Sequence, residues 1–387
     1  MKRWLWLLPF LLLALPACAQ EYAGYTLPAD RDPYSFLALN RRDTIVRSWV
    51  ENDLNMTLPN HITWYRDGQV LRDLPYYPRG VTASLESACF VATREDAFKT
   101  LVLHQTGAVT APTGTETARE IPVYRCSLYD WTEKGLEHPV DIPLGTATLC
   151  IAGPYILTVD NGPGGSGAVR VYDAEGKLQQ TIDLPGAANL VLVNAKYLGQ
   201  DTFLISGHDG DYGAYARMAL RDGKLLWRIH TPQYYDVHGD GRGGFFAVED
   251  QNCGDYSSVT LAHYDENGQV DRRRTLINNT LVKHIMRIYP HPDGSGWTAY
   301  GMAVANSRRV YTVFALTLDE EMNAVAWDIR GLSKQYRDYS PGISLAADGT
   351  VQVLTSSIGN LENKAPAAVI PFDALPAQTD GISFRWE

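Results

Sequence analysis

The sequence is poor in cysteine and has no cysteine spacing typical of a metal site. It contains 5 cysteines among 387 residues, with no C-x-x-C pair and no neighbouring histidine pattern, so no zinc site is expected. Basic residues are also few, 34 against 44 acidic ones. This balance excludes nucleic acid and anionic lipid as principal partners, because both require clustered Lys and Arg. The basic run Arg272 to Arg274 lies in a predicted strand and is interpreted as a solvated face.

Long apolar runs are absent except at the N-terminus. Lys2 and Arg3 precede an apolar run from Trp4 to Leu15, and small residues follow it, which is the layout of a secretory signal peptide. The run is too short to span a bilayer comfortably. We therefore predict that residues 1–19 are a signal peptide and that the remaining chain is extracytoplasmic.

Two processing sites remain open at the end of this run. Leu15-Pro16-Ala17-Cys18 resembles a bacterial lipobox, although Pro16 departs from the usual residue there, and cleavage before Cys18 would leave that cysteine lipidated. Ala17-Cys18-Ala19 offers instead an A-x-A cleavage site before Gln20. The first alternative gives a soluble domain anchored to a membrane by lipid alone, and the second gives a secreted or periplasmic one.

The other four cysteines are spaced irregularly, at Cys89, Cys126, Cys150 and Cys253. Export permits disulfides, and Cys126 with Cys150 is the pairing to test first. Buried free thiols are an equal alternative, since free cysteine packs as a small hydrophobic residue.

A repeated turn motif is the strongest feature of the chain. An apolar or aromatic residue lies one or two positions before an Asp, which Gly often follows closely, at seven positions separated by 63, 43, 49, 43, 54 and 54 residues. Such lengths suit one four-stranded propeller blade each. Asp-Gly between apolar runs predicts a hairpin turn, so each marker is interpreted as the turn between the third and fourth strands of a blade. The marker aspartates are Asp67, Asp130, Asp173, Asp222, Asp265, Asp319 and Asp373.

The repeat predicts an all-β fold, a single β-propeller over residues 20–387 with seven four-stranded blades. Five units are legible, and the near-continuous apolar runs at 245–248, 297–302 and 351–354 are predicted to be second strands. The first two blades, about 33–145, are irregular, because 35–54 and 84–103 also fit amphipathic helices. Six blades with an N-terminal elaboration, and a pair of β-sandwiches, are the alternatives.

The segment from Met218 to Trp227, with its apolar strand, Gly-Lys turn and Leu-Trp pair, resembles the repeat of quinoprotein-like (PQQ-like) propellers. The resemblance covers about the C-terminal two-thirds of the chain. It implies a propeller of the non-catalytic type that acts as a scaffold or binding module in the bacterial envelope. Bound PQQ is not expected, because the catalytic members have a vicinal disulfide and eight blades, whereas no two cysteines are adjacent here.

The unusual loops are those between predicted second and third strands. Loops on a rigid scaffold are where binding residues concentrate, and in a propeller these loops gather at the channel mouth. Several carboxylates of this kind can together bind calcium, but no EF-hand pattern is present, and we interpret these Asp and Gly residues as solvated turns. The candidate binding residues are His208, Asp209, Asp211, Tyr212, Glu249, Asp250 and Asp255.

No catalytic residue is assigned from the sequence. His208, His238 and His291 lie near Asp209, Asp240 and Asp293, and a His and Asp pair can perform acid-base work, but no G-x-S-x-G elbow supports a hydrolase. We expect a non-catalytic binding or scaffold module for a protein or glycan partner, without cofactor or metal. The alternative is a carbohydrate-active lyase or hydrolase with its site at the channel mouth.

Overall fold

The computed structural model describes most of the chain from Gly24 onward, and the predicted signal peptide with Cys18 lies outside the described residues. The described residues are 24–28, 31–50, 60–76, 87–94, 97–111, 119–132, 134–143, 148–152, 155–161, 167–184, 190–209, 214–232, 236–251, 258–278, 281–305, 310–332, 342–355, 367–377 and 383–387. No helix in these ranges is long and apolar enough to cross a membrane.

The described strands form seven antiparallel sheets, numbered here in chain order. Sheet 1 is β2 (Arg31–Ala38), β3 (Asp43–Val50), β4 (Asn60–Arg66) and β5 (Gln69–Tyr76). Sheet 2 is β6 (Ser87–Arg94), β7 (Ala97–Ala111), β8 (Arg119–Thr132) and β9 (Gly135–Ile142). Sheet 3 is β10 (Thr148–Ala152), β11 (Tyr155–Asn161), β12 (Gly167–Tyr172) and β13 (Leu178–Leu184). Sheet 4 is β14 (Leu190–Gly199), β15 (Thr202–Asp209), β16 (Ala214–Arg221) and β17 (Lys224–Pro232).

The remaining sheets include both ends of the described chain. Sheet 5 is β18 (Asp236–Gly239), β19 (Phe245–Gln251), β20 (Ser258–Tyr264), β21 (Val270–Asn278) and β29 (Phe384–Trp386), and sheet 6 is β22 (Leu281–Pro290), β23 (Trp297–Ala305), β24 (Val310–Leu318) and β25 (Ala324–Gly331). Sheet 7 is β26 (Gly342–Leu345), β27 (Val351–Thr355), β28 (Ala368–Pro371) and β1 (Tyr25–Thr26), and a short 3₁₀ helix, η1 (Phe372–Ala374), follows β28.

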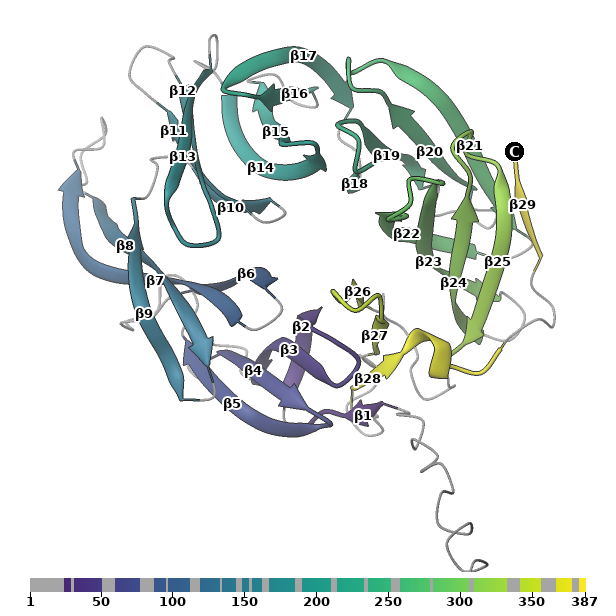
Figure 1. Cartoon of the computed structure of the whole chain (residues 1–387), viewed down its shortest axis with the longest axis horizontal. Coiled ribbons are helices and arrows are strands. Elements are labelled where there is room, and N and C mark those ends of the chain that lie inside the picture. Colours follow the sequence, from purple (N-terminus) through teal and green to yellow (C-terminus); the bar gives the residue numbers. More distant parts are fainter. Residues whose placement is uncertain are drawn as a thin grey trace, which may run out of the picture.

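The sheets are arranged around a common centre, with the first strand of each nearest to it (Figure 1). Seven buried apolar clusters occur among the described residues, and each combines side chains of two neighbouring sheets. One of them joins Val46 and Tyr65 of sheet 1 to Leu354 and Val369 of sheet 7. The chain therefore has an all-β propeller fold whose core lies between sheets.

The second strands are buried on both faces, as their apolar runs predicted. Phe245 to Val248 in β19 are fully buried, and Val353 in β27 is as well. A strand enclosed by its neighbours on both sides gains from apolar residues at every position, whereas an outer strand does not. Val325 in the outermost strand β25 is accordingly 65% exposed.

Five of the marker aspartates lie in the turns for which they were predicted, between the third and fourth strands of their sheets. Asp67 and Asp222 begin two-residue turns and have positive φ angles of 49° and 50°. Asp173, Asp265 and Asp319 begin longer turns, and each accepts two backbone N–H groups through Oδ1 at 2.7 to 3.0 Å. The carboxylate thus replaces hydrogen bonds that the chain loses by reversing direction.

Two weaker markers were wrong as turns. Asp130 lies inside β8, where its carboxylate contacts Lys99 and, at 3.0 Å, Nδ1 of His138. Asp373 lies in η1, after the third strand of sheet 7. That sheet takes its fourth strand, β1, from the other end of the chain, so no hairpin follows β28.

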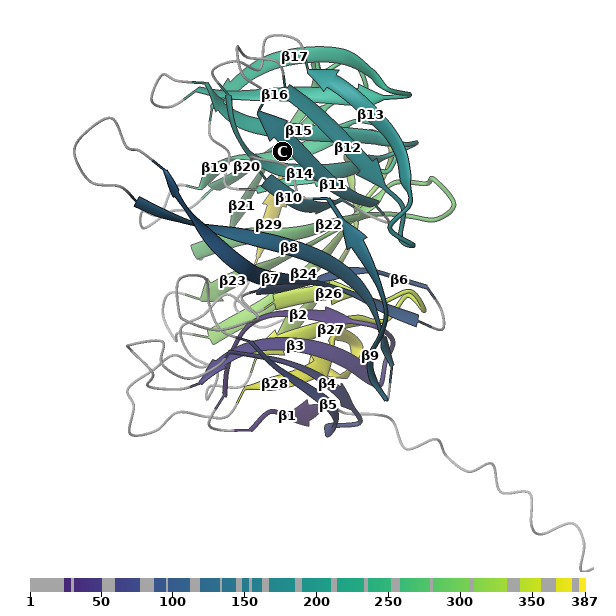
Figure 2. The ribbon, with the colours of Figure 1, turned by 90° about the vertical axis from the view of Figure 1, so that its left-hand side faces the viewer.

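The irregular first two units are strands, and the helical alternative is wrong. Residues 31–50 form β2 and β3, and 87–111 form β6 and β7. The long interval between Asp67 and Asp130 arises from β7 and β8, which have 15 and 14 residues. Their paired ends project beyond the other sheets (Figure 2).

Candidate functional site

Antiparallel strands place the connections of every sheet on two opposite faces. The turns between first and second and between third and fourth strands form one face, named the hairpin face. The opposite side, where second and third strands connect, is named the loop face. The candidate binding residues belong to the loop face: His208 and Asp209 end β15, and Asp250 lies near the end of β19. Their side chains, and the whole of Asp211, Tyr212 and Asp255, lie outside the described residues.

Glu249 is the one candidate whose side chain is described. Arg273 of β21 donates two hydrogen bonds to its carboxylate, at 2.9 and 3.2 Å, and the Glu249 side chain is 19% exposed. The paired guanidinium neutralises this carboxylate and fixes its position. Glu249 therefore helps to hold sheet 5 together at the loop-face end of β19.

The predicted disulfide lies only partly within the described residues. Cys126 of β8 is buried at 1% exposure among Leu101, Leu128 and Ile142, in the cluster between sheets 2 and 3. Cys150 lies on β10, and its side chain is outside the described residues, as are those of Cys89 and Cys253. The pairing of Cys126 with Cys150 stays a prediction.

The basic run in β21 joins two sheets, which corrects its interpretation as a simply solvated face. Arg272 donates to the backbone carbonyl of Glu320, and Arg274 donates to that of Glu321 at 3.4 Å. Both acceptors lie in the turn between β24 and β25 of sheet 6. The guanidinium groups thus satisfy carbonyls that a tight turn leaves without strand partners.

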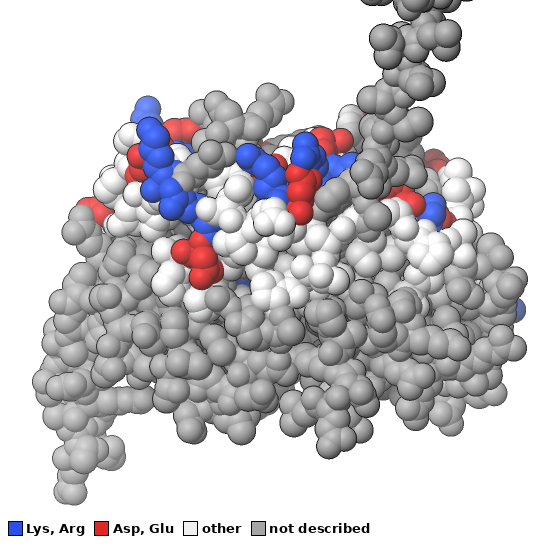
Figure 3. All heavy atoms as spheres, turned by 90° about the horizontal axis from the view of Figure 1, so that it is seen from below, with Lys and Arg blue, Asp and Glu red and all other residues white. Residues whose placement is uncertain are grey.

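Charged and polar side chains join neighbouring sheets along the rest of the hairpin face. Arg41 pairs with Asp373 at 2.9 Å, linking sheets 1 and 7, and Arg242 pairs with Glu320 at 3.0 Å, linking sheets 5 and 6. In the part of the molecule seen in Figure 3, basic and acidic side chains lie next to one another. On the hairpin face these ion pairs therefore connect the turns of neighbouring sheets.

A buried ionisable cluster lies inside sheet 5, and no motif in the sequence predicted it. His263 lies between two aspartates: its Nε2 is 3.2 Å from Oδ2 of Asp240, and its Nδ1 is 2.6 Å from Oδ1 of Asp271. Burial alone lowers the pKa of His263, but the hydrogen bonds and charges of the two carboxylates outweigh it and raise this pKa above its usual value. The two carboxylates therefore favour the imidazolium form of His263.

Asp240 connects this cluster to sheet 6. Its Oδ1 accepts the backbone N–H groups of Arg242 and Gly244 at 2.7 and 2.9 Å, which shapes the turn between β18 and β19. Its backbone carbonyl accepts the indole N–H of Trp297 in β23 at 2.8 Å. The cluster is thus part of the junction between sheets, and both carboxylate oxygens of Asp240 accept hydrogen bonds.

Two of the three histidines singled out from the sequence, His238 and His291, have described side chains, and the contacts found for them are with residues other than their expected aspartates. His238, in the inner strand β18, has Nε2 at 3.4 Å from Oδ2 of Asp236, and not beside Asp240. His291 contacts the hydroxyl groups of Ser295 and Thr298 at 3.0 and 2.9 Å.

A group of charges lies on the inner strands of sheets 5 and 6. Oδ2 of Asp236 is 3.4 Å from His238 and 3.6 Å from Nη1 of Arg287 in β22. The Arg287 side chain is 48% exposed. Throughout the described part of the chain, no set of three or more His, Cys, Asp or Glu is placed to hold a metal ion.

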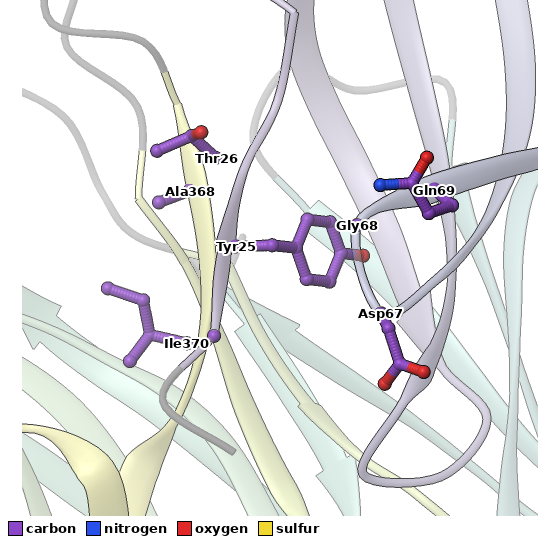
Figure 4. A pocket seen from close by; sticks show the side chains of 8 residues that line it. Tyr25, Thr26, Asp67, Gly68, Gln69, Ala368 and Ile370 are labelled. Atoms are coloured by element: carbon purple, nitrogen blue, oxygen red, sulfur yellow. The ribbon is translucent and has the colours of Figure 1, made fainter.

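An open pocket of about 520 Å³ lies at the junction of sheets 7 and 1. Its walls are residues 24–26 with β1, the turn 67–69, and Ala368 and Ile370 of β28. Figure 4 shows Tyr25 pointing from β1 toward Gly68 in the turn. Tyr25 also packs against Tyr65 of sheet 1, with ring centroids 5.7 Å apart, so β1 contacts sheet 1 as well as pairing with sheet 7.

No family model matches this chain, and no curated protein matches it. Solved structures similar to it include the WD40 domain of SCAP from fission yeast, at 10% identity over 90% of this chain and 96% of that one with a TM-score of 0.41. YCF48 bound to D1 peptide is similar at 10% identity over 92% and 99%, with a TM-score of 0.43. An acylaminoacyl peptidase of Pyrococcus horikoshii is similar at 11% identity over 90% and 52%, with a TM-score of 0.45. These likenesses carry no argument about the function of this chain.

Proposed function

We propose that this chain is a non-catalytic, extracytoplasmic propeller that binds a protein or glycan partner through its loop face. In this proposal each of the seven sheets is one blade, and β1 closes the ring. The exported chain is either anchored by lipid at Cys18 or released after cleavage before Gln20.

One observation carries the proposal: the described ionisable groups of the hairpin face are used to fix turns and to join sheets. Asp173 and Asp319 close turns, Arg41 and Arg242 join sheets, and His263 lies between two carboxylates. A scaffold with this many cross-sheet contacts presents the connections of its opposite face in a fixed arrangement, which is how binding loops are commonly displayed.

Site-specific photo-crosslinking tests which face binds. A photoreactive residue is placed at Asp250 on the loop face, and a matched control at Lys224, which is exposed in the turn end of β17 on the hairpin face. The mature domain is irradiated in an envelope extract and, separately, on a glycan array. We expect the variant labelled at Asp250 to give specific adducts or array signals, and the variant labelled at Lys224 to give none. Equal labelling from both positions would contradict binding by the loop face.

Mass spectrometry of the mature N-terminus tests export and anchoring. Expression of the full chain in a bacterial host should give a product that begins at lipidated Cys18 or at Gln20, in the envelope or periplasmic fraction. Cys18→Ser should release the protein from the membrane fraction if the lipid anchor is present. An unprocessed chain in the cytoplasmic fraction would refute the export proposal.

A further inference from the structure

Sheet 5 has a fifth strand, whereas the other six described sheets have four. β29 pairs antiparallel with the outer edge of β21, with Phe384 opposite Asn278 and Trp386 opposite Leu276. Thr275 and Glu387 extend the ladder with two further backbone hydrogen bonds of 2.7 and 3.1 Å. Figure 1 shows β29 outside β21 and beside β25.

The side chains of β29 alternate between a buried and a solvated role. The ring of Phe384 stacks on Trp327 of sheet 6, with centroids 4.7 Å apart and planes inclined by 3°, and lies 5.1 Å from Phe314. The indole N–H of Trp386 donates to the carbonyl of Met322 at 2.7 Å. Arg385, between them, is 68% exposed. β29 is therefore bound as an extended peptide is bound, by a sheet edge and two aromatic contacts.

Sheet 4 shows what β29 supplies. In β17, Trp227 donates its indole N–H to the carbonyl of Glu266, in the next sheet's hairpin turn, at 2.7 Å. The corresponding position of β21, opposite the third strand in the same register, is Arg272, which donates to the carbonyl of Glu320 in the following turn. Trp386 adds an indole contact to the same turn from a separate segment, at the carbonyl of Met322. The junction between sheets 5 and 6 thus keeps its own contact from β21, and β29 adds a tryptophan to it.

The walls of this site are held by contacts that do not involve β29. The turn between β24 and β25 is closed by Asp319, whose Oδ1 accepts the N–H groups of Glu321 and Asn323 at 3.0 and 2.7 Å. Arg272 and Arg274 fix the same turn to β21. Removal of β29 would therefore leave the edge of β21, the Trp327 surface and the Met322 carbonyl in place.

We propose that the outer edge of β21, with Trp327, Phe314 and the Met322 carbonyl, is a binding site for an extended segment of a partner protein that has aromatic residues at alternate positions. We name it the β21 groove. In the resting chain β29 occupies it as a built-in competitor. A three-residue strand is short enough to open locally, and its tether gives it a high effective concentration. The inference is independent of binding by the loop face.

Peptide exchange tests the β21 groove. Residues 378–382 are replaced by a site-specific protease sequence in the mature domain, which is cleaved after folding. A fluorescent peptide with the sequence of residues 377–387 is then titrated by anisotropy. A second protein is left uncleaved and carries Phe384→Ala and Trp386→Ala, which remove the aromatic contacts of β29 and open the groove. It serves as the test protein if cleavage harms folding of the first. Thermal unfolding checks both proteins.

Both proteins should bind the peptide at least tenfold more tightly than the uncleaved natural chain does. In the peptide, Phe384→Ala with Trp386→Ala should abolish binding, Trp386→Phe should weaken it up to about tenfold through the lost hydrogen bond, and Arg385→Ala should change it less than twofold. Absence of binding to both folded proteins would overturn the proposal. So would equal binding to the uncleaved chain, which would place the peptide elsewhere.

Discussion

Replacement of His263 should reduce stability in a way that depends on pH. In His263→Gln the buried carboxylate of Asp240, whose side chain is 4% exposed, loses its charged partner. Removing one member of a buried ion pair costs about 3–5 kcal/mol. Because Asp271, the other partner, is 35% exposed and solvated in part, we expect the lower end, about 3 kcal/mol in the free energy of unfolding near pH 6.

The pH dependence follows from the direction of the pKa shift. The pKa of His263 is higher in the folded protein than its usual value of 6.5. Its contribution to stability is therefore complete below pH of about 6.5 and is lost as the pH rises through the raised folded pKa. The difference between the natural chain and His263→Gln should accordingly be largest at acidic pH and should shrink toward pH 9.

Thermal unfolding of the mature domain from pH 5.5 to 9 measures this difference. An unfolding entropy of about 2.1 cal/mol/K per residue over roughly 360 residues gives about 0.76 kcal/mol/K, so about 3 kcal/mol lowers Tm by about 4 °C. His138→Gln is the matched control, since that histidine also contacts an aspartate but its side chain is 79% exposed, and its effect should stay below about 0.5 kcal/mol. A constant difference across this pH range, or one that grows with pH, would refute the reasoning.

Three further predictions concern the junctions between sheets. Gly199→Ala should destabilise the fold by more than about 3 kcal/mol, because Gly199 has a φ of +94° and a Cβ there would lie 2.1 Å from the carbonyl oxygen of Gly241. Gly223 has a φ of +70°, and the atom nearest to a Cβ there is 3.6 Å away, so Gly223→Ala should cost only about 1–2 kcal/mol. Chemical denaturation measures both changes. The hydrogen bond to Asp201 raises the pKa of Tyr155 to about 12. In Asp201→Asn this pKa should fall toward 10, as measured by ultraviolet titration of the phenolate, with Tyr155→Phe identifying the signal. An unchanged pKa would contradict the hydrogen bond as the cause. Trp227→Phe should cost about 1 kcal/mol by removing the hydrogen bond to the Glu266 carbonyl, and urea unfolding that shows no loss would mean that the indole N–H contributes nothing there.

Local chemistry explains the parts of the fold that the sequence predicted well. The Asp-Gly turns at 67–68 and 222–223 require positive φ, which few residue types adopt, so these dipeptides predicted the hairpins at both positions correctly. The buried second strands are continuous apolar runs because two neighbouring sheets cover them. Amphipathic periodicity failed in the described residues 35–50, where the helical and strand patterns both fit and pairing with β4 decided for strands.

The candidate site depended much more on tertiary structure. Sequence spacing placed His238 with Asp240, but β-strand alternation and the turn at 240–244 direct Asp240 toward His263, which lies 23 residues farther along the chain. The role of the run Arg272 to Arg274 was hidden because its acceptors are backbone carbonyls, which leave no trace in the choice of residue.

By itself the sequence determined the strand repeat, the turns and the alternation of buried and exposed positions, because each depends on residues close together in the chain. Only the tertiary structure decided which ends of the chain complete which sheets. β1 pairs with β28, which lies hundreds of residues away in the chain. β29 pairs with β21, which lies about a hundred residues before it. Such short strands have no periodicity of their own, and their partners are selected by the open sheet edges that remain when the other strands have paired.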